Sequence, residues 1–455
     1  MIIGRTAEIE YLNKIFNQDT GSLVTLYGVP GVGTTSVWRD FVKDKKFVYI
    51  KCPKAGFRQI NYLLSGNLSL KGYRFSSDFP DFNEILENIS ANHKLDKYVL
   101  ILDDFENFFK ADDSYIENLF TFLRINKADN RFMILLVSHD TRYVENNFVK
   151  DIGKHALSIS GFLKIHPVSF LETVMFYNTD DTSRCMDLFA LLGGNIAFYD
   201  YFDIGLDLKE NIIDNFLSSS SVFRNAGTEV VLEHLREVNV YGTILYCLAN
   251  GKTKLNDIYL HTGFSRAKIS VYLKNLMSLD IVEKFASFDA PGSDNTMKGI
   301  YRISNPIVLF WYRFIYPNEM YLSVMSPEKY YNLFIKDALS EFLKNSIPYI
   351  CREYLTLLNK KGQLPIDIVK SGEWIGKAGT IHFIGRDSQR NTLCAYCALG
   401  DGPMDSDEYD WFLYCLKEAG IHADYIYLFS KNGFDRKLKE RITADTVVFT
   451  DINNL

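Results

Sequence analysis

Short apolar runs alternate with helical stretches through the first two hundred residues of the chain. The four runs occupy residues 23–27, 47–50, 98–102 and 132–137. A strand that is apolar along its whole length is buried on both faces, as in a parallel sheet that helices cover on both sides. The pattern therefore predicts an α/β fold built on a parallel sheet.

The middle of the chain has a helical period instead. Residues 241–248 predict an apolar helix, residue 255 begins a second, and residues 265–278 have apolar positions at helical spacing. Residues 281–284 and 300–303 follow as two short β-prone runs. Three helices followed by a pair of strands predict a winged helix-turn-helix.

The third helix of this motif is basic. It contains Arg266, Lys268 and Lys274 and no acidic residue. The third helix of the domain is the recognition helix, which lies in the major groove when such a domain binds DNA. Its Lys and Arg side chains can neutralise DNA phosphates. Two interpretations stay open: the helix contacts double-stranded DNA, or its basic residues form the solvated face of a spacer domain.

The loop after the first predicted strand reads Gly28-Val29-Pro30-Gly31-Val32-Gly33-Thr34-Thr35. It has the spacing and the context of the phosphate-binding pattern G-x-x-x-x-G-K-[ST], except that Thr34 stands where the pattern has Lys. In such a loop, backbone N–H groups and the N-terminus of the following helix bind phosphate. The residues predicted to bind a nucleotide are Gly28, Gly31, Gly33, Thr34, Thr35 and Ser36.

Loss of the Lys removes the charge that neutralises the β- and γ-phosphates. Binding of ATP is therefore expected to weaken, and its hydrolysis to suffer more. The alternative is a Gly-rich turn that holds no ligand.

Two acids end the third predicted strand, as in a Walker B element. Asp103, together with the Thr35 hydroxyl, is expected to hold Mg²⁺. Asp104 stands where many ATPases carry a catalytic Glu that orients the attacking water. The alternative is an ordinary acidic strand end. The fourth strand ends in Ser138-His139-Asp140, where His139 is either a polar sensor residue or a chance loop residue.

Four further segments resemble, in order, a family of archaeal-type P-loop ATPases that is also common in bacteria and is AAA-like and related to the STAND signal-transduction ATPases. Residues 3–12 resemble its "GR-x-x-E-h-x-x-L" start, and residues 166–172 its "L-x-P-h-S-F-x-E" segment. Residues 193–199 resemble "GG-x-P-x-Y" without the Pro, and residues 301–314 resemble "Y-x-I-x-D-P-h-h-x-F-W-Y-R-F". The resemblance implies a P-loop NTPase sheet, a helical lid and a winged helix-turn-helix.

The last third resembles the restriction-endonuclease-like domain of the DUF234 type that ends this family, a PD-(D/E)XK-like α/β domain. Residues 350–355, 374–376 and 427–434 carry the resemblance. It implies a mixed sheet flanked by helices from about residue 320 onward.

The catalytic positions of that domain are lost. The places of its metal-binding acids and Lys are taken by His382, Tyr396 and Ala398. Since a nuclease of this fold needs carboxylates to bind Mg²⁺ and activate water, nuclease activity is not expected. Glu373 is expected to precede the strand and Asp387 to lie in the turn after it, so that neither points into the cleft.

Composition narrows the function. With 50 basic and 56 acidic residues in 455, the net charge is −6, which excludes a globally basic nucleic-acid binder. No apolar run reaches the ~18 residues that span a bilayer, and the N-terminus does not resemble a signal peptide. Seven scattered Cys argue against a disulfide framework, and the close pair Cys394 and Cys397 suits a buried strand better than a zinc site. A cytoplasmic protein without a membrane partner is expected.

The expected domains are a P-loop ATPase core (1–160), a helical lid (161–228), a winged helix-turn-helix (229–318) and a degenerate restriction-endonuclease-like domain (319–455). Two functions remain. The first is an ATP-binding regulator with weak or no ATPase activity that acts with DNA, a protein partner or further copies of itself. The second is a non-enzymatic DNA-binding or protein-interaction scaffold that has lost nucleotide binding.

Overall fold

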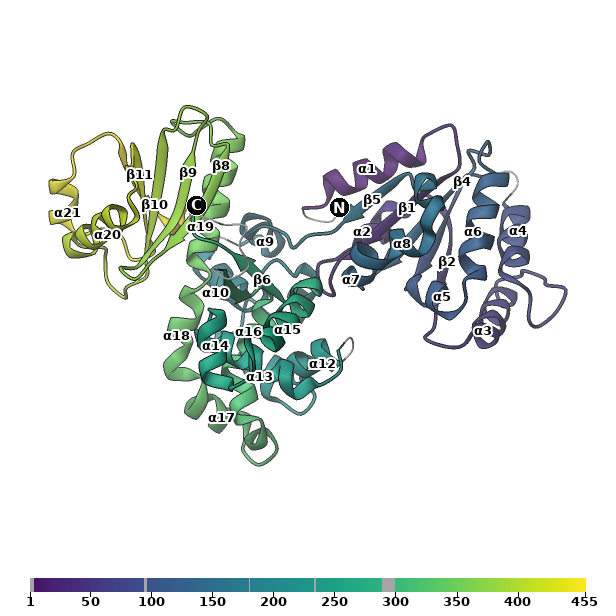
Figure 1. The fold of residues 1–455 in the computed structure, drawn as a ribbon, viewed down its shortest axis with the longest axis horizontal. Coiled ribbons are helices and arrows are strands. Elements are labelled where there is room, and N and C mark those ends of the chain that lie inside the picture. The colour runs from purple at the N-terminus through teal and green to yellow at the C-terminus, as the bar shows by residue number, and fades with distance from the viewer. Residues whose placement is uncertain (1–3, 94–95, 180, 233–234, 289–298) are drawn as a thin grey trace. The chain divides into compact units, whose positions relative to one another are not determined.

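The computed structural model separates into two compact units (Figure 1). It describes residues 4–93, 96–179, 181–232, 235–288 and 299–455. The first unit comprises residues 1–168, 194–199 and 278–280, and the second comprises residues 169–193, 200–277 and 281–455. Among the described residues, no helix is long and apolar enough to cross a membrane.

A five-stranded parallel sheet with the order β2-β3-β4-β1-β5 forms the centre of the first unit. Its strands are β1 (Ser22–Tyr27), β2 (Lys46–Lys51), β3 (Tyr98–Asp103), β4 (Phe132–Ser138) and β5 (Gly161–Lys164). The four strands predicted from apolar runs and their parallel arrangement are confirmed. Strand β5, which pairs with β1, is an addition that the apolar pattern did not predict.

Helices cover both faces of this sheet. On one face lie α1 (Thr6–Phe16) and α2 (Thr34–Phe41), packed on side chains that include Val99 and Ile101 of β3. The other face is covered by α3 (Phe57–Ser69), α4 (Phe82–Asn92), α5 (Glu106–Ala111) and α6 (Ser114–Ile125), together with α7 (Thr141–Tyr143) and α8 (Val149–Ile152) beyond β4. Because side chains alternate along a strand, Asp103 belongs to the α2 face and Ser138 to the α5 face.

Helices α9 (Phe170–Tyr177), α10 (Thr182–Leu192), α11 (Leu208–Ile212) and α12 (Ala226–Leu232) open the second unit. The winged helix-turn-helix follows as α13 (Val238–Ala249), α14 (Leu255–Thr262), α15 (Arg266–Ser278) and the antiparallel pair β6 (Val282–Phe285) and β7 (Ile300–Ile303). The predicted motif is confirmed in its order and in the pairing of its strands.

The segment with the "F-W-Y-R-F" motif is a core element. It contains α16 (Pro306–Phe310) and the turns after it, where Trp311 and Tyr312 are almost fully buried. The Trp311 ring packs on Gly227, where any Cβ would collide with it, and its indole N–H donates to the Arg224 carbonyl at 2.8 Å. Helices α17 (Pro327–Phe334), α18 (Lys336–Lys344) and α19 (Ile347–Lys360) lead on to the second sheet.

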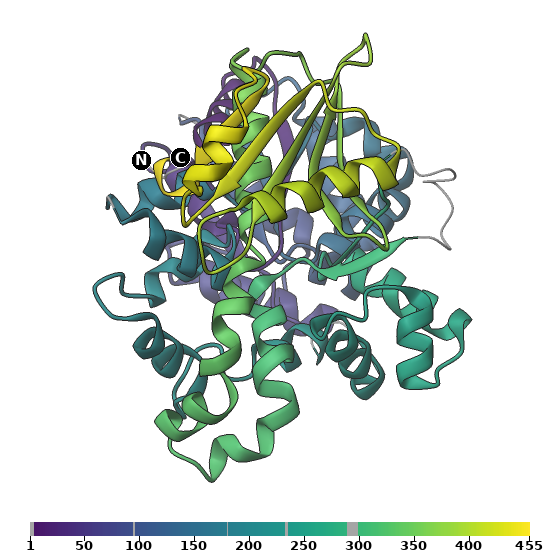
Figure 2. The same cartoon turned by 90° about the vertical axis from the view of Figure 1, so that its left-hand side faces the viewer.

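The second sheet is mixed, with the order β12-β11-β10-β9-β8. Its strands are β8 (Lys370–Ile375), β9 (Thr380–Arg386), β10 (Thr392–Ala398), β11 (Tyr425–Ser430) and β12 (Val447–Asp451), antiparallel from β8 to β10 and parallel from β10 to β12. Helix α19 packs on one face, and α20 (Ser406–Ala419) with α21 (Arg436–Arg441) on the other (Figure 2). The predicted mixed sheet flanked by helices is confirmed.

Candidate functional site

The loop between β1 and α2 has the backbone shape of a phosphate loop. Gly31 and Gly33 have φ values of 93° and 95°, a region in which a residue with a Cβ is strained. Gly33 is the N-cap of α2 and provides no side-chain cap. Within the part of the chain that is described, the backbone N–H groups of Gly33, Thr34 and Thr35 have no acceptor. The loop therefore presents unpaired donors at a helix N-terminus, as an anion site requires.

Thr34 occupies the Lys position without replacing it. Its side chain is turned inward, with 1% of its surface exposed, and its hydroxyl has no partner among the described residues. A Cβ built on Gly28 would lie 2.8 Å from the Ile165 carbonyl oxygen and 3.0 Å from this hydroxyl, which explains why Gly stands there. Thr35 and Ser36 are both partly exposed.

Arg5 is a buried cation behind the loop. Its guanidinium donates to the carbonyl oxygens of Val32 at 2.6 Å and His166 at 2.8 Å, and it pairs with Glu8 at 3.2 Å. Both main-chain partners are carbonyl oxygens. Arg5 therefore fixes the loop in place, and its charge is already compensated by Glu8.

Residues 194–199 pack on the loop. A Cβ built on Gly31 would lie 2.3 Å from the Phe198 ring, one on Gly33 would lie 3.1 Å from Ile196, and the Ala197 N–H donates to the Gly31 carbonyl at 3.0 Å. Ile196 stands in the place of the family's Pro. The glycines of the loop are thus covered by apolar side chains on this side.

Asp103 lies at the end of β3, on the face that α2 covers. Its carboxylate accepts a hydrogen bond from the Tyr49 hydroxyl at 2.7 Å and one from the Asp104 N–H at 3.1 Å. The Tyr49 ring stacks on Trp38 of α2, with ring centroids 5.2 Å apart. The predicted magnesium ligands Asp103 and Thr35 are thereby on the same face of the sheet.

Asp104, the predicted catalytic acid, turns toward β2. Its backbone is left-handed, with a φ of 52°, and its carboxylate pairs with Lys51 at 3.2 Å. The pairing with Lys51 raises the pKa of that ammonium.

Glu106 is an acid at this strand edge that sequence reasoning missed. It opens α5, and burial raises the pKa of its carboxyl to about 7, although its own backbone and the neighbouring Ser138 act in the opposite direction. Its position three residues after Asp103 was visible in the sequence, but its burial was not.

At the end of β4, where a sensor residue was predicted, His139 has an unpaired ring nitrogen within the described residues, whereas Asp140 and Ser138 are hydrogen-bonded. The Nδ1 atom of His139 is buried and has no partner in the described part of the chain. Asp140 caps α7 through the Tyr143 N–H at 2.9 Å and pairs with Lys110 at 3.0 Å. Ser138 is fully buried and accepts the Asp140 N–H at 3.0 Å.

The three predicted DNA-contacting residues are all exposed on α15. The guanidinium of Arg266 lies 3.9 Å from the Tyr259 ring centroid and donates to Asn256 at 2.5 Å. Lys268 lies within 5.4 Å of the Tyr272 ring, and Lys274 is solvent-exposed. Two of the three cations therefore also contact aromatic rings of their own domain.

The positions of the second sheet that the resemblance assigns to metal ligands hold hydrogen-bonded polar residues. His382 Nδ1 accepts the Cys397 N–H at 3.1 Å, and burial, with the neighbouring Arg302 and Arg352, lowers the pKa of the imidazole to about 4. The Tyr396 hydroxyl donates to Glu408 at 3.0 Å.

Nearby, Ala398 is buried on the sheet. Cys394 and Cys397 both lie on the fully buried strand β10, as predicted, and point to opposite faces of the sheet. All seven cysteines of the chain are buried and free.

Glu373 precedes β9, as expected, and lies within a strand of its own, β8, where its carboxylate is 8% exposed. Arg302 donates to both of its oxygens, at 2.8 and 3.3 Å, and Arg352 lies 3.8 Å away. Because β8 begins with the polar residues Lys370 and Ser371, the apolar pattern of the sequence did not predict this strand. Asp387 does lie in the turn after β9, where it accepts N–H groups of that turn.

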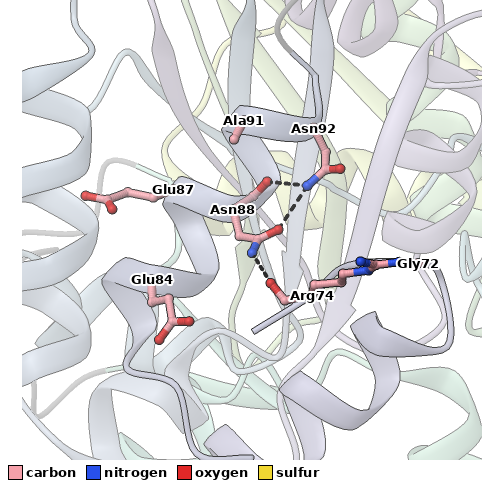
Figure 3. A pocket seen from close by; sticks show the side chains of 7 residues that line it. All are labelled: Gly72, Arg74, Glu84, Glu87, Asn88, Ala91 and Asn92. Carbon is pink, nitrogen blue, oxygen red and sulfur yellow. Dashed lines mark hydrogen bonds between the residues drawn. The ribbon is translucent and has the colours of Figure 1, made fainter. Parts of the chain in front are cut away.

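A separate hollow of about 540 Å³ lies beside α4 (Figure 3). Its lining residues are Gly72, Arg74, Glu84, Glu87, Asn88, Ala91 and Asn92. The amide of Asn88 donates to the Arg74 carbonyl, and the amide of Asn92 donates to Asn88. None of these residues belongs to the phosphate loop or to a strand end, so the candidate site is the strand edge and not this hollow.

Two family models match segments of the chain. Residues 311–398 match DUF234, described as archaeal and bacterial proteins of unknown function, and residues 243–284 match the helix-turn-helix of bacterial regulatory proteins of the arsR family. An uncharacterized protein of Methanocaldococcus jannaschii is 23% identical over 414 residues, which cover 86% of each chain.

Solved structures are similar to part of this chain, and the first of them has a TM-score that shows a shared fold. The Walker-type ATPase PABY2304 of Pyrococcus abyssi superposes with a TM-score of 0.50 at 15% identity, over 69% of this chain and 96% of that one. The ORC2 protein of Aeropyrum pernix, solved in ADPNP–ADP complexes, matches with a TM-score of 0.41 at 13% identity, over 70% and 94% of the two chains. The resemblance to P-loop ATPases with a DUF234 region is confirmed.

Proposed function

We propose that this chain, which joins a P-loop ATPase fold to an arsR-type helix-turn-helix and a DUF234 region, binds ATP with Mg²⁺, turns it over slowly or not at all, and acts as a nucleotide-dependent regulator on double-stranded DNA. The observation that carries the proposal is the loop itself. Two left-handed glycines at the N-terminus of α2 leave N–H donors unpaired beside a buried strand end that carries Asp103.

The roles follow from the site. The loop from Gly28 to Ser36 would hold the phosphates, with N–H groups as donors in place of the missing Lys charge. Thr35 and Asp103 would hold Mg²⁺, a hard cation that prefers such oxygen ligands. Bound Mg²⁺ would supply part of the positive charge that Thr34 does not.

The DNA contact is proposed for α15. Its exposed face carries Arg266, Lys268 and Lys274, and the matched family model describes regulatory proteins. A basic recognition helix gives affinity through phosphates before it gives sequence preference. A protein partner or a second copy of the chain remains a further candidate for this regulator, and the cytoplasm its proposed location.

One observation favours the alternative, a scaffold that has lost nucleotide binding. Phe198 and Ile196 cover the glycines of the loop, and Thr34 leaves it without a cation. Under this proposal Ile196 and Phe198 line one side of the nucleotide site. Under the alternative they fill the space that a nucleotide would need.

Isothermal titration of the full chain with ATP separates the two. We expect binding with Mg²⁺ that weakens about tenfold in EDTA and in Asp103→Asn, since each change removes a charge contact. The control is Glu10→Gln on the exposed side of α1, which should bind as the unaltered chain does. No binding at millimolar ATP would establish the scaffold instead.

A further inference from the structure

Glu106 is a buried acid with an unused oxygen. Its side chain is 7% exposed, and its Oε2 atom has no hydrogen-bond partner within the described residues. Most buried polar atoms have a hydrogen-bond partner, and burying one without a partner destabilises the fold. Such a carboxyl oxygen is therefore a candidate for a functional role.

The neighbours of Glu106 place it on the side of the phosphate loop. Ser138, at the end of β4, acts to lower the pKa of its carboxyl, against the larger effect of burial, and the Ser138 carbonyl accepts the N–H of Gly28, the first residue of the loop, at 3.3 Å. The Phe105 N–H is bonded to β4 as well, through the Val137 carbonyl at 3.3 Å. The end of β4 is thus hydrogen-bonded both to Phe105, the residue before Glu106, and to the loop.

Asp104 faces the opposite way. The sheet order is β2-β3-β4-β1, so β2 and β4 lie on opposite sides of β3. Asp104 pairs with Lys51 at the end of β2, away from β1 and its loop. Its carboxylate is one methylene shorter than that of a Glu, and Lys51 already occupies it.

We infer that Glu106, and not Asp104, is the carboxylate that orients and deprotonates the water attacking ATP. The inference rests on the proposed function. The water oxygen forms a bond to the γ-phosphorus while the bond from that phosphorus to the β,γ-bridging oxygen breaks, and the electron pair of the broken bond leaves with ADP. The proton of the water passes to the Glu106 carboxylate and then to the released phosphate.

The protonation of Glu106 suits this role. Burial raises the pKa of its carboxyl to about 7, and a general base works best when its pKa lies near the working pH. At neutral pH a large fraction of the carboxyl is ionised and able to accept the proton.

The test uses the full chain with Thr34→Lys, which restores the missing cation, as the background. Glu106→Gln, Asp104→Asn and the exposed control Glu10→Gln are added to it one at a time. Single-turnover release of γ-phosphate measures the chemistry, and isothermal titration with ATP·Mg²⁺ measures binding. We expect Glu106→Gln to slow turnover about a hundredfold and Asp104→Asn to slow it less than about fivefold, with affinities within about threefold of the background in both. Glu106→Gln and Asp104→Asn are also made in the unaltered chain, which serves as a second background.

Three outcomes overturn the inference. If Asp104→Asn abolishes turnover and Glu106→Gln does not, Asp104 is the catalytic acid. If ATP binds but Thr34→Lys brings no turnover, Glu106 has no water to act on and the proposed binding function still stands. If ATP does not bind at all, the proposed function falls and the inference falls with it.

Discussion

Thr34 is the residue at which this loop differs most from a fully charged phosphate loop. Its side chain is buried against Gly28, and its hydroxyl has no partner among the residues that the structure describes. A buried hydroxyl carries no charge with which to neutralise a γ-phosphate. The buried Arg5 does not substitute, because Glu8 and two carbonyl oxygens already take up its guanidinium.

Replacement of Thr34 by Lys is expected to raise ATP turnover about a hundredfold. One charge contact to the transition state in a closed site contributes on the order of 3 kcal/mol. Phosphate release at saturating ATP measures the change, and Thr34→Ala, which adds no charge, should give no gain. Robust hydrolysis by the unaltered chain that Asp103→Ala abolishes would mean that another cation has replaced the Lys.

Glu106 makes stability depend on pH. The folded-state pKa of about 7 lies above the ordinary 4.5, so both states are protonated below pH 4.5 and the acid then has no effect. As pH rises from 4.5 through 7, the unfolded chain loses the proton first, and the folded state is destabilised by up to about 3 kcal/mol at pH 8. Glu106→Gln should therefore be more stable than the unaltered chain at pH 8 and similar to it at pH 4.5.

Urea unfolding at these two pH values measures the difference. Glu10→Gln, an exposed acid, is the control and should change neither value. An equal effect of Glu106→Gln at both pH values would mean that the acid is not held in a high-pKa state.

At the scale of elements, continuous apolar runs made the first sheet predictable. Strands β3 and β4 are buried at every position, and no surface pattern interrupts them. Strand β5 has four residues with Phe162 exposed, so it lacks both length and pattern. Strand β8 begins with three small or charged residues, and the apolar pattern therefore did not predict it.

The candidate site was predictable only in part, for the same reason. Glycine spacing and a strand ending in acids identified the loop and Asp103 from local order alone. The roles of Asp104 and Glu106 depend on which neighbouring strand each faces, and that follows from the sheet order. The order of the strands in a sheet cannot be predicted from the local pattern of the sequence.

The basic helix α15 gives the third prediction. Lys268→Ala with Lys274→Ala should weaken binding of a double-stranded DNA probe by about tenfold at 0.1 M salt and lower the salt slope by about 2, since each phosphate contact contributes about 0.9 to that slope. Fluorescence anisotropy over a salt series measures both. Lys329→Ala, an exposed cation of α17, is the matched control. An unchanged slope would mean that α15 is a solvated face.

The second sheet gives the fourth prediction, that plasmid DNA is not cleaved with Mg²⁺ or Mn²⁺. The positions that the resemblance assigns to metal ligands hold His382, Tyr396 and Ala398, and Glu373 is paired with Arg302. Agarose gels of supercoiled plasmid, run against a buffer blank, measure this. Metal-dependent cleavage that Asp387→Ala removes would show a nuclease site built from other acids.

At the scale of the whole molecule, the chain passes repeatedly between its two units. Residues 194–199 belong to the first unit, while residues on both sides of them, 169–193 and 200–277, belong to the second. The same six residues contact the phosphate loop through Ile196 and Phe198. The segment that contacts the phosphate loop is therefore joined, at both of its ends, to the unit that contains α15. A change in the conformation of the loop can reach that unit through this segment.

This connection predicts that ATP and DNA affect each other's binding. ATP·Mg²⁺ should change the affinity for double-stranded DNA by about 5- to 150-fold, the range of an allosteric coupling of 1–3 kcal/mol, and DNA must change the affinity for ATP by the same factor. Anisotropy with and without ATP, and titration of ATP with and without DNA, measure the two sides of the cycle. Phe198→Ala should reduce the factor while each separate affinity persists, because the contact between residues 194–199 and Gly31 would be weakened. Equal affinities in the presence and absence of the other ligand would show that the units bind independently, and the chain would then be a carrier of two separate sites rather than a regulator.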